Sequence, residues 1–245
     1  MAAQEPFVPA LIVVDFQQDF CPPNGSLAVP DARSIAPAIN ALLALPFALK
    51  LATRDWHPSD HVSFAANHAA ASPFTSLATV VHPADPSRSY DTTLWPVHCL
   101  QDAPGAALVP ELDVARLDAV VDKGTDPRFE MYSAFYDPFR LTDSGIAARL
   151  ASRRVTHVFV VGLAADYCVK ATAESAADEG FTTYIVDEAT KPVYPDKWPA
   201  SAGHVLAKGV RIVSVAGDEL ARVKSAEGDQ TCHDSDWRGT PARGL

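Results

Sequence analysis

The chain has 245 residues, of which 48% are hydrophobic and 20% are charged, values typical of a globular protein rather than a disordered or fibrous one. A chain of this length can bury about 70% or more of its unfolded surface, in one large domain or two small ones. The net charge of −10 disfavours nucleic acid or an anionic membrane as a partner, because binding phosphate requires Lys and Arg. A small, neutral or weakly charged substrate fits better.

The predicted elements alternate in chain order between short β-branched apolar runs and longer helical patterns, which is typical of a parallel sheet with crossover helices. We expect strands at residues 10–15, 47–53, 117–122, 155–161, 182–186 and 211–215. We expect helices at residues 32–45, 143–152, 166–179 and 199–208. The sequence therefore predicts one α/β domain with about six mostly parallel strands and helices on both faces, in a Rossmann-like arrangement of three layers.

Two segments do not fit this alternation. Residues 54–110 are rich in Pro, His, Ser and Asp and are too long for a plain connection, so we interpret them as a functional insertion. Residues 225–245 are polar and lack periodicity, which favours a loose tail after a domain spanning residues 1–224.

The sequence also bears on the expected location of the protein and on its cysteines. Residues 1–9 lack the basic segment and apolar run of a secretory signal, no apolar stretch reaches about 18 residues, and no peroxisomal signal is evident. We therefore expect a cytoplasmic protein. The four cysteines contain no Cys-x-x-Cys pair, which predicts free thiols rather than a disulfide framework or a zinc ribbon.

Three reactive residue types lie where predicted strands end, which is the edge at which open α/β sheets bind ligands. Asp15 ends the first strand, where it is a catalytic carboxylate or only a cap, and Lys123 follows the third, where it is a held cation or a surface charge. Cys168 lies near the start of the helix after Gly162, where exposed N–H groups and the positive helix end would lower a thiol's pKa and stabilise an oxyanion. A buried structural thiol is the alternative.

A second group of residues has the chemistry of a metal site. Asp55 and His57 follow the second strand, His61 lies four residues further on, and His98 lies in the insertion. Carboxylate and imidazole together suit a divalent ion such as zinc, manganese or iron. The Asp-x-His pattern alone is weak, because other histidines in this chain need not be ligands.

Taken together, these segments resemble the isochorismatase-like cysteine hydrolases, and among them the nicotinamidases of fungal type. The resemblance covers about residues 10–215. The matching blocks are Asp15 with Gln17 and Phe20, residues 54–58 (RDWHP) with Ser63-Phe64 and Asn67-His68, and residues 95–99 (WPVHC), 121–124 (VDKG), 132–135 (YSAF) and 162–172 (GLAADYCVKAT). The Asp-x-His and Trp-Pro-x-His-Cys patterns point to nicotinamidases in particular.

The resemblance implies a set of roles for these positions. Asp15, Lys123 and Cys168 would form a catalytic triad, and the N–H groups of Ala164 and Cys168, after a cis peptide, would form an oxyanion hole. One divalent metal ion would bind at Asp55, His57 and His98. A pyridine pocket would be lined by Phe20, Trp95 and Tyr132. The implied reaction is hydrolysis of nicotinamide through a cysteine thioester, with zinc as the expected ion and iron or manganese as alternatives.

Several points stay open at this stage. His61 is a possible further metal ligand, and a slightly long loop before Met131 leaves the role of Glu130 undecided. Acceptance of pyrazinamide and the formation of a homo-oligomer are also undecided. The alternatives are another amidase of the same family and a non-catalytic metal- or ligand-binding member, because fold alone does not fix function.

Overall fold

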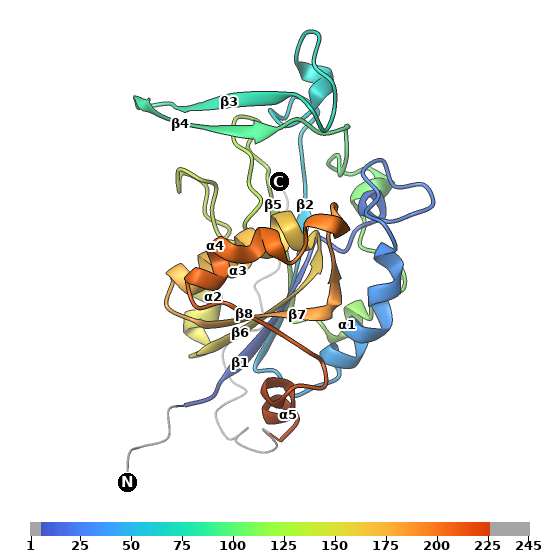
Figure 1. Cartoon of the computed structure of the whole chain (residues 1–245), viewed down its shortest axis with the longest axis vertical. Helices are drawn as coiled ribbons and strands as arrows, with labels where there is room; N and C mark the ends of the chain where they lie inside the picture. Colours follow the sequence, from blue (N-terminus) through green and yellow to red (C-terminus); the bar gives the residue numbers. More distant parts are fainter. Residues whose placement is uncertain (1–5, 226–245) are drawn as a thin grey trace, which may run out of the picture.

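A six-stranded parallel sheet forms the centre of the molecule, as Figure 1 shows for a computed structural model that describes residues 6–225. Its order is β5-β2-β1-β6-β7-β8, and every neighbouring pair is parallel. The strands are β1 (Pro9–Val14), β2 (Leu49–Asp55), β5 (Ala119–Lys123), β6 (His157–Leu163), β7 (Thr182–Lys191) and β8 (Arg211–Val213). The predicted α/β class and strand number are confirmed.

Helices cover both faces of this sheet, as predicted. They are α1 (Ala36–Leu43), α2 (Ile146–Ser152), α3 (Lys170–Asp178), α4 (Gly203–Ala207) and α5 (Asp218–Ser225). Side chains alternate between faces along a strand, and in β1 Leu11 and Val13 pack with residues of α1 and α5. Ala10, Ile12 and Val14 pack on the other face with α2, α3 and α4. The result is a three-layer arrangement with β1 buried at its centre.

A separate antiparallel hairpin joins β2 to β5. It consists of β3 (Leu77–His82) and β4 (Asp85–Thr93), and Figure 1 shows it projecting beyond the main sheet. Neither this hairpin nor α5 was expected from the sequence. The bounds expected for the insertion, residues 54–110, stay a prediction. Ser225 ends α5, and the rest of the predicted tail lies outside the described residues.

The strand register gathers the predicted site residues at one edge. Asp15 directly follows β1, and Asp55 and Lys123 are register partners at the ends of β2 and β5. On the other side of β1, Gly162 of β6 pairs with Val14. Gly162 has φ +105°, and a Cβ added there would lie 2.1 Å from the Val14 carbonyl oxygen, so only glycine allows this close approach.

Between residues 6 and 225, none of the helices combines the length and the apolar character needed to cross a bilayer.

Candidate active site

Lys123 is the centre of a buried charged cluster. Its Nζ lies 3.0 Å from Asp15 Oδ2 and 2.5 Å from Asp55 Oδ1, donates to the Met131 carbonyl at 2.9 Å, and is 3.6 Å from Cys168 Sγ. The lysine is 1% exposed. Burial disfavours its charge, but the carboxylates of Asp15 and Asp55 hold the pKa of Lys123 well above its ordinary value. The structure thus brings together the three residues predicted as a triad.

The carboxylate of Asp15 is fully buried. Its φ of +47° lies in the left-handed region, which aspartate tolerates better than most residues. The Thr53 hydroxyl donates to Asp15 Oδ1 at 2.6 Å and accepts the Asp15 backbone N–H at 3.2 Å. Burial raises the pKa of Asp15 to about 6, although Lys123 opposes the rise. At neutral pH this carboxyl group is therefore ready to accept a proton and also able to return it.

Cys168 lies in a single π-helical turn, Ala165–Val169, between β6 and α3. Such turns occur frequently at functional sites. The expectation of a lowered thiol pKa is wrong for this environment. Burial raises the pKa of Cys168 well above its ordinary value, and the carboxylates of Asp15 and Asp55 add to the rise, while Lys123 opposes it. The resting group is a neutral thiol, which needs a base before it can attack.

Asp55, His57 and His98 form the predicted metal-binding group. Within residues 6–225, each offers one ligand atom within 4.8 Å of the others. The Nε2 atoms of His57 and His98 lie 3.6 and 4.0 Å from Asp55 Oδ2. Ligands about 2.1 Å from a tetrahedral zinc ion lie roughly 3.4 Å apart, so these separations are close to those of a zinc site.

Hydrogen bonds orient both imidazoles toward Asp55. The Nδ1 atoms of His57 and His98 bond to the carbonyls of Gly124 and Pro96, each at 2.8 Å, which leaves the Nε2 atoms facing the carboxylate. In the described part of the chain, the buried Nε2 of His57 has no hydrogen-bond partner. An orphaned ring nitrogen beside a buried carboxylate fits a bound cation, so the residues present suit a divalent metal ion.

Two neighbours set the position of this group. A Cβ at Gly124, whose φ is +64°, would lie 2.4 Å from the His57 ring, so glycine makes room for the imidazole. The Gln17 amide accepts the Asp55 N–H at 2.8 Å and donates to the carbonyl of the same residue at 2.8 Å. Gln17 is fully buried and fixes the Asp55 backbone from both sides. The sequence matched Gln17 to the family but gave no hint of this contact.

His61 has both ring nitrogens engaged elsewhere. Its Nδ1 bonds to Ser63 Oγ at 2.8 Å and its Nε2 to the Phe129 carbonyl at 3.1 Å, while its ring stacks on His57. Burial, aided by the nearby His57, lowers the pKa of His61 to about 2. His61 therefore supports the ring of His57, and its own nitrogens are held by Ser63 and Phe129.

Glu130, whose role the sequence left undecided, lies in the pocket. It is 3% exposed, and its Oε1 accepts the Met131 backbone N–H at 3.0 Å. Burial raises the pKa of Glu130, with the negative charge of Asp55 adding to the rise and His57 opposing it. Glu130 thus places a carboxyl group on the wall of the pocket that Asp55 and His98 also line.

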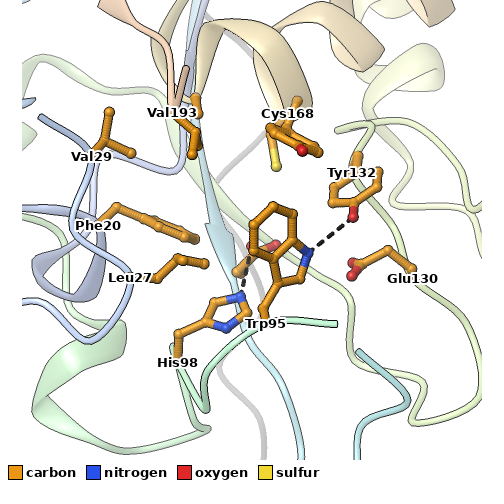
Figure 2. A pocket seen from close by; sticks show the side chains of 12 residues that line it. Phe20, Leu27, Val29, Trp95, His98, Glu130, Tyr132, Cys168 and Val193 are labelled. Atoms are coloured by element: carbon orange, nitrogen blue, oxygen red, sulfur yellow. Dashed lines mark hydrogen bonds and ion pairs between the residues drawn. The ribbon is translucent and has the colours of Figure 1, made fainter. Parts of the chain in front are cut away.

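A largely apolar pocket opens onto both groups of residues. Figure 2 shows the Cys168 sulfur pointing into it, with Phe20 on one side and Tyr132 on the other. Trp95 donates its indole N–H to the Tyr132 hydroxyl at 3.0 Å, which fixes the two rings relative to each other. The structure thus places all three predicted pocket residues on the wall. No sequence pattern had indicated the other apolar lining residues, which are Leu27, Val29, Tyr167 and Val193.

Ala164, the other residue predicted for an oxyanion hole, also lines this pocket. The Leu163-Ala164 peptide is cis, as the resemblance implied. The Ala164 carbonyl accepts the N–H groups of Tyr167 and Val169, each at 3.1 Å. These bonds hold the turn that carries Cys168 directly against the end of β6.

The fold and the buried cluster define the class: a three-layer α/β protein with a cysteine-centred site at the carboxyl edge of its sheet. An isochorismatase domain model matches residues 9–217, so the chain belongs to the isochorismatase family.

Named relatives refine this assignment. A nicotinamidase of Acinetobacter baylyi is 40% identical over 184 residues, which is 75% of this chain and 81% of that protein. The yeast nicotinamidase, solved with the inhibitor nicotinaldehyde, superposes with a TM-score of 0.79 at 35% identity, covering 84% of this chain and 99% of that one. The pyrazinamidase of Pyrococcus horikoshii, solved in complex with zinc, gives a TM-score of 0.65 at 32% identity, with 84% and 99% covered.

Proposed function

We propose that this protein is a nicotinamidase, which hydrolyses nicotinamide to nicotinate and ammonia. The observation that carries the proposal is the buried cluster of Asp15, Lys123 and Cys168 opening into an aromatic-walled pocket beside Asp55 and His98. The cluster supports the reaction type, and the pocket together with the metal-binding residues supports the substrate. The names of the relatives agree with both.

The first step is the activation of the Cys168 thiol. An oxygen of Asp15 lies within 4.8 Å of the Cys168 sulfur, so a small movement brings it into reach of the thiol proton. Lys123, 3.6 Å from the sulfur, stabilises the thiolate that results. The thiolate then attacks the carboxamide carbon, and the backbone N–H groups of Ala164 and Cys168 receive the developing oxyanion.

Asp15 serves both halves of the reaction. It first passes its proton to the amide nitrogen, so that ammonia leaves rather than an amide anion, and a nicotinoyl thioester remains on Cys168. It next removes a proton from a water molecule, which attacks the thioester. Collapse of that adduct expels the sulfur, which takes the proton back from Asp15 and becomes a thiol again, and releases nicotinic acid, which ionises to nicotinate. The pKa of about 6 suits a group that must accept and donate protons near neutrality.

Asp55, His57 and His98 would hold one divalent ion, with zinc as the first candidate and iron or manganese as alternatives. When bound, such an ion supplies a Lewis acid that can coordinate a pyridine nitrogen. Phe20, Trp95 and Tyr132 provide flat apolar surface for the ring. Pocket and ion would together orient the carboxamide toward Cys168. A cytoplasmic location and the absence of nucleic-acid or membrane partners stay predictions.

The test is to mix the zinc-loaded protein with nicotinamide and measure ammonia. The wild type should release it and Cys168→Ala should not, while Cys21→Ala, which removes another buried thiol outside the site, should remain active. A panel that includes pyrazinamide separates the alternatives. Ammonia from another carboxamide but not from nicotinamide would assign a sibling amidase, and none from any carboxamide would assign a binding protein.

A further inference from the structure

Asp166 holds two consecutive peptide groups from a distant part of the chain. It lies two residues before Cys168 in the π-helical turn and is 6% exposed. Its Oδ1 accepts the Val193 N–H at 2.8 Å, and its Oδ2 accepts the Tyr194 N–H at 2.9 Å. Both carboxylate oxygens are thus used to fasten the segment after β7 to the turn that carries Cys168.

This fastened segment forms part of the pocket wall. The pairing of β6 with β7 ends at Leu163 and Lys191, and Val193 lies just past that point. Val193 lines the pocket together with Cys168, and in Figure 2 it lies between Val29 and Cys168. Beyond the end of the strand pairing, the two hydrogen bonds that Asp166 accepts fix the position of Val193.

We propose that Asp166 is a positioning residue that sets substrate affinity by holding Val193 against the bound ring, an inference that rests on the proposed nicotinamidase function. Hydrogen bonds to an ionised carboxylate are about twice as strong as neutral ones, and a buried N–H that loses its acceptor is costly. When an amide replaces the carboxylate, one of the two N–H groups loses its acceptor and faces an NH2 donor instead, and the segment moves away from the pocket.

The chemical step should be spared by that movement. The turn around Cys168 keeps the backbone bonds from Tyr167 and Val169 to the Ala164 carbonyl, which do not involve the Asp166 side chain. The contacts of Lys123 with Asp15 and Asp55 likewise come from other elements. Loss of Asp166 is therefore expected to weaken binding and to leave kcat nearly intact.

The experiment compares Asp166→Asn with a matched control, Asp137→Asn. The Asp137 carboxylate also accepts backbone N–H groups, those of Phe139 and Leu141 at 2.8 and 2.7 Å, but Asp137 is not among the residues that line the pocket. D166N should raise the KM for nicotinamide about five- to tenfold, the equivalent of one lost hydrogen bond, with kcat within about twofold. D137N should lower Tm and leave KM unchanged.

Two further measurements test the route through Val193. Calorimetric titration of nicotinamide into the Cys168→Ala protein, with and without D166N, should show the same rise in Kd in the absence of turnover. In a double-mutant cycle, adding D166N to Val193→Ala should raise KM by less than about twofold more, because both changes remove the same wall contact. Where D166N does not fold, Asp166→Glu, which keeps the charge but displaces it by one methylene, should give the same KM shift.

A wild type that hydrolyses nicotinamide, with a D166N variant that matches its KM, would overturn this inference alone. The inference would also be overturned if D166N raised KM by the same factor with and without Val193→Ala, or if D166N lowered only kcat. A wild type that releases no ammonia from nicotinamide would instead contradict the proposed function.

Discussion

Replacing Lys123 by Met should destabilise the fold and stop the reaction together. The change keeps most of the side-chain volume but removes the only cation that contacts both Asp15 and Asp55 among the described residues. Oxygens of these carboxylates lie within 4.8 Å of each other. At an effective dielectric constant of about 20, two unit charges at that separation repel by roughly 3.5 kcal/mol. This agrees with the about 3–5 kcal/mol lost when one partner of a buried ion pair is removed.

That loss should appear as a change in Tm that depends on pH. A domain of this size loses about 2–4 °C per kcal/mol, so K123M should melt roughly 6–20 °C below the wild type at pH 7.5. Without the lysine, the pKa of the Asp15 carboxyl rises further above its unfolded value, so folding takes up a proton. Stability contributed by such a group is present at low pH and lost as pH rises through the folded pKa. The deficit should therefore be smaller at pH 5.

The assay is thermal unfolding in a chelating buffer, so that metal binding does not add to Tm, with Lys208→Met as the control. Lys208 also lies between two carboxylates, 2.7 Å from Glu174 and 2.9 Å from Asp178, but at the surface, where such pairs contribute less than about 1 kcal/mol. Zinc-loaded K123M should lose at least about 100-fold in kcat/KM, since its base is protonated. Equal Tm values for K123M and K208M, or full activity in K123M, would refute the reasoning.

Two further predictions concern protonation and metal binding. Activity should rise with pH around a midpoint near 6 as Asp15 ionises, and Thr53→Val, which removes a hydrogen bond to that carboxylate, should move the midpoint of kcat/KM to higher pH by about one unit. An unmoved or lowered midpoint would contradict the role of Asp15 as the base. Zinc at about 100 times its Kd should add roughly 2.7 kcal/mol to the chelated protein, or about 5–10 °C in Tm. His57→Ala should lose this zinc-induced shift and His61→Asn should keep it; loss of the shift in H61N would contradict a zinc site formed by Asp55, His57 and His98 that does not depend on His61.

The fold was largely predictable because its strands are marked by composition. The run of residues 155–161 is so apolar that only a central strand suits it, and β6 indeed begins and ends within two residues of that range. The β3–β4 hairpin was missed because apolar residues of β3 occur on both of its faces: Ala78 and Val80 face inward, while Leu77 and Val81 are exposed. Its residues are also largely polar in β4, which made them look like a loop.

The reactive residues of the site could be predicted from the sequence, but the surrounding contacts that position them and shift their pKa values could not. Asp15 and Lys123 could be placed because parallel strands end at one edge. The raised pKa of Cys168 could not be foreseen, since it depends on burial beside carboxylates that only the folded chain brings near. The hydrogen bonds of Gln17 to Asp55, and of Asp166 to Val193, join residues far apart in sequence and leave no local pattern.

The central claim, covalent catalysis by Cys168, is tested most directly by partitioning between water and hydroxylamine. Nicotinamide and methyl nicotinate should form the same thioester, so the ratio of nicotinohydroxamate to nicotinate at a fixed hydroxylamine concentration should be identical for the two donors. Both products should disappear in Cys168→Ala. A ratio that depends on the leaving group would mean that no common acyl-enzyme forms and would contradict the account.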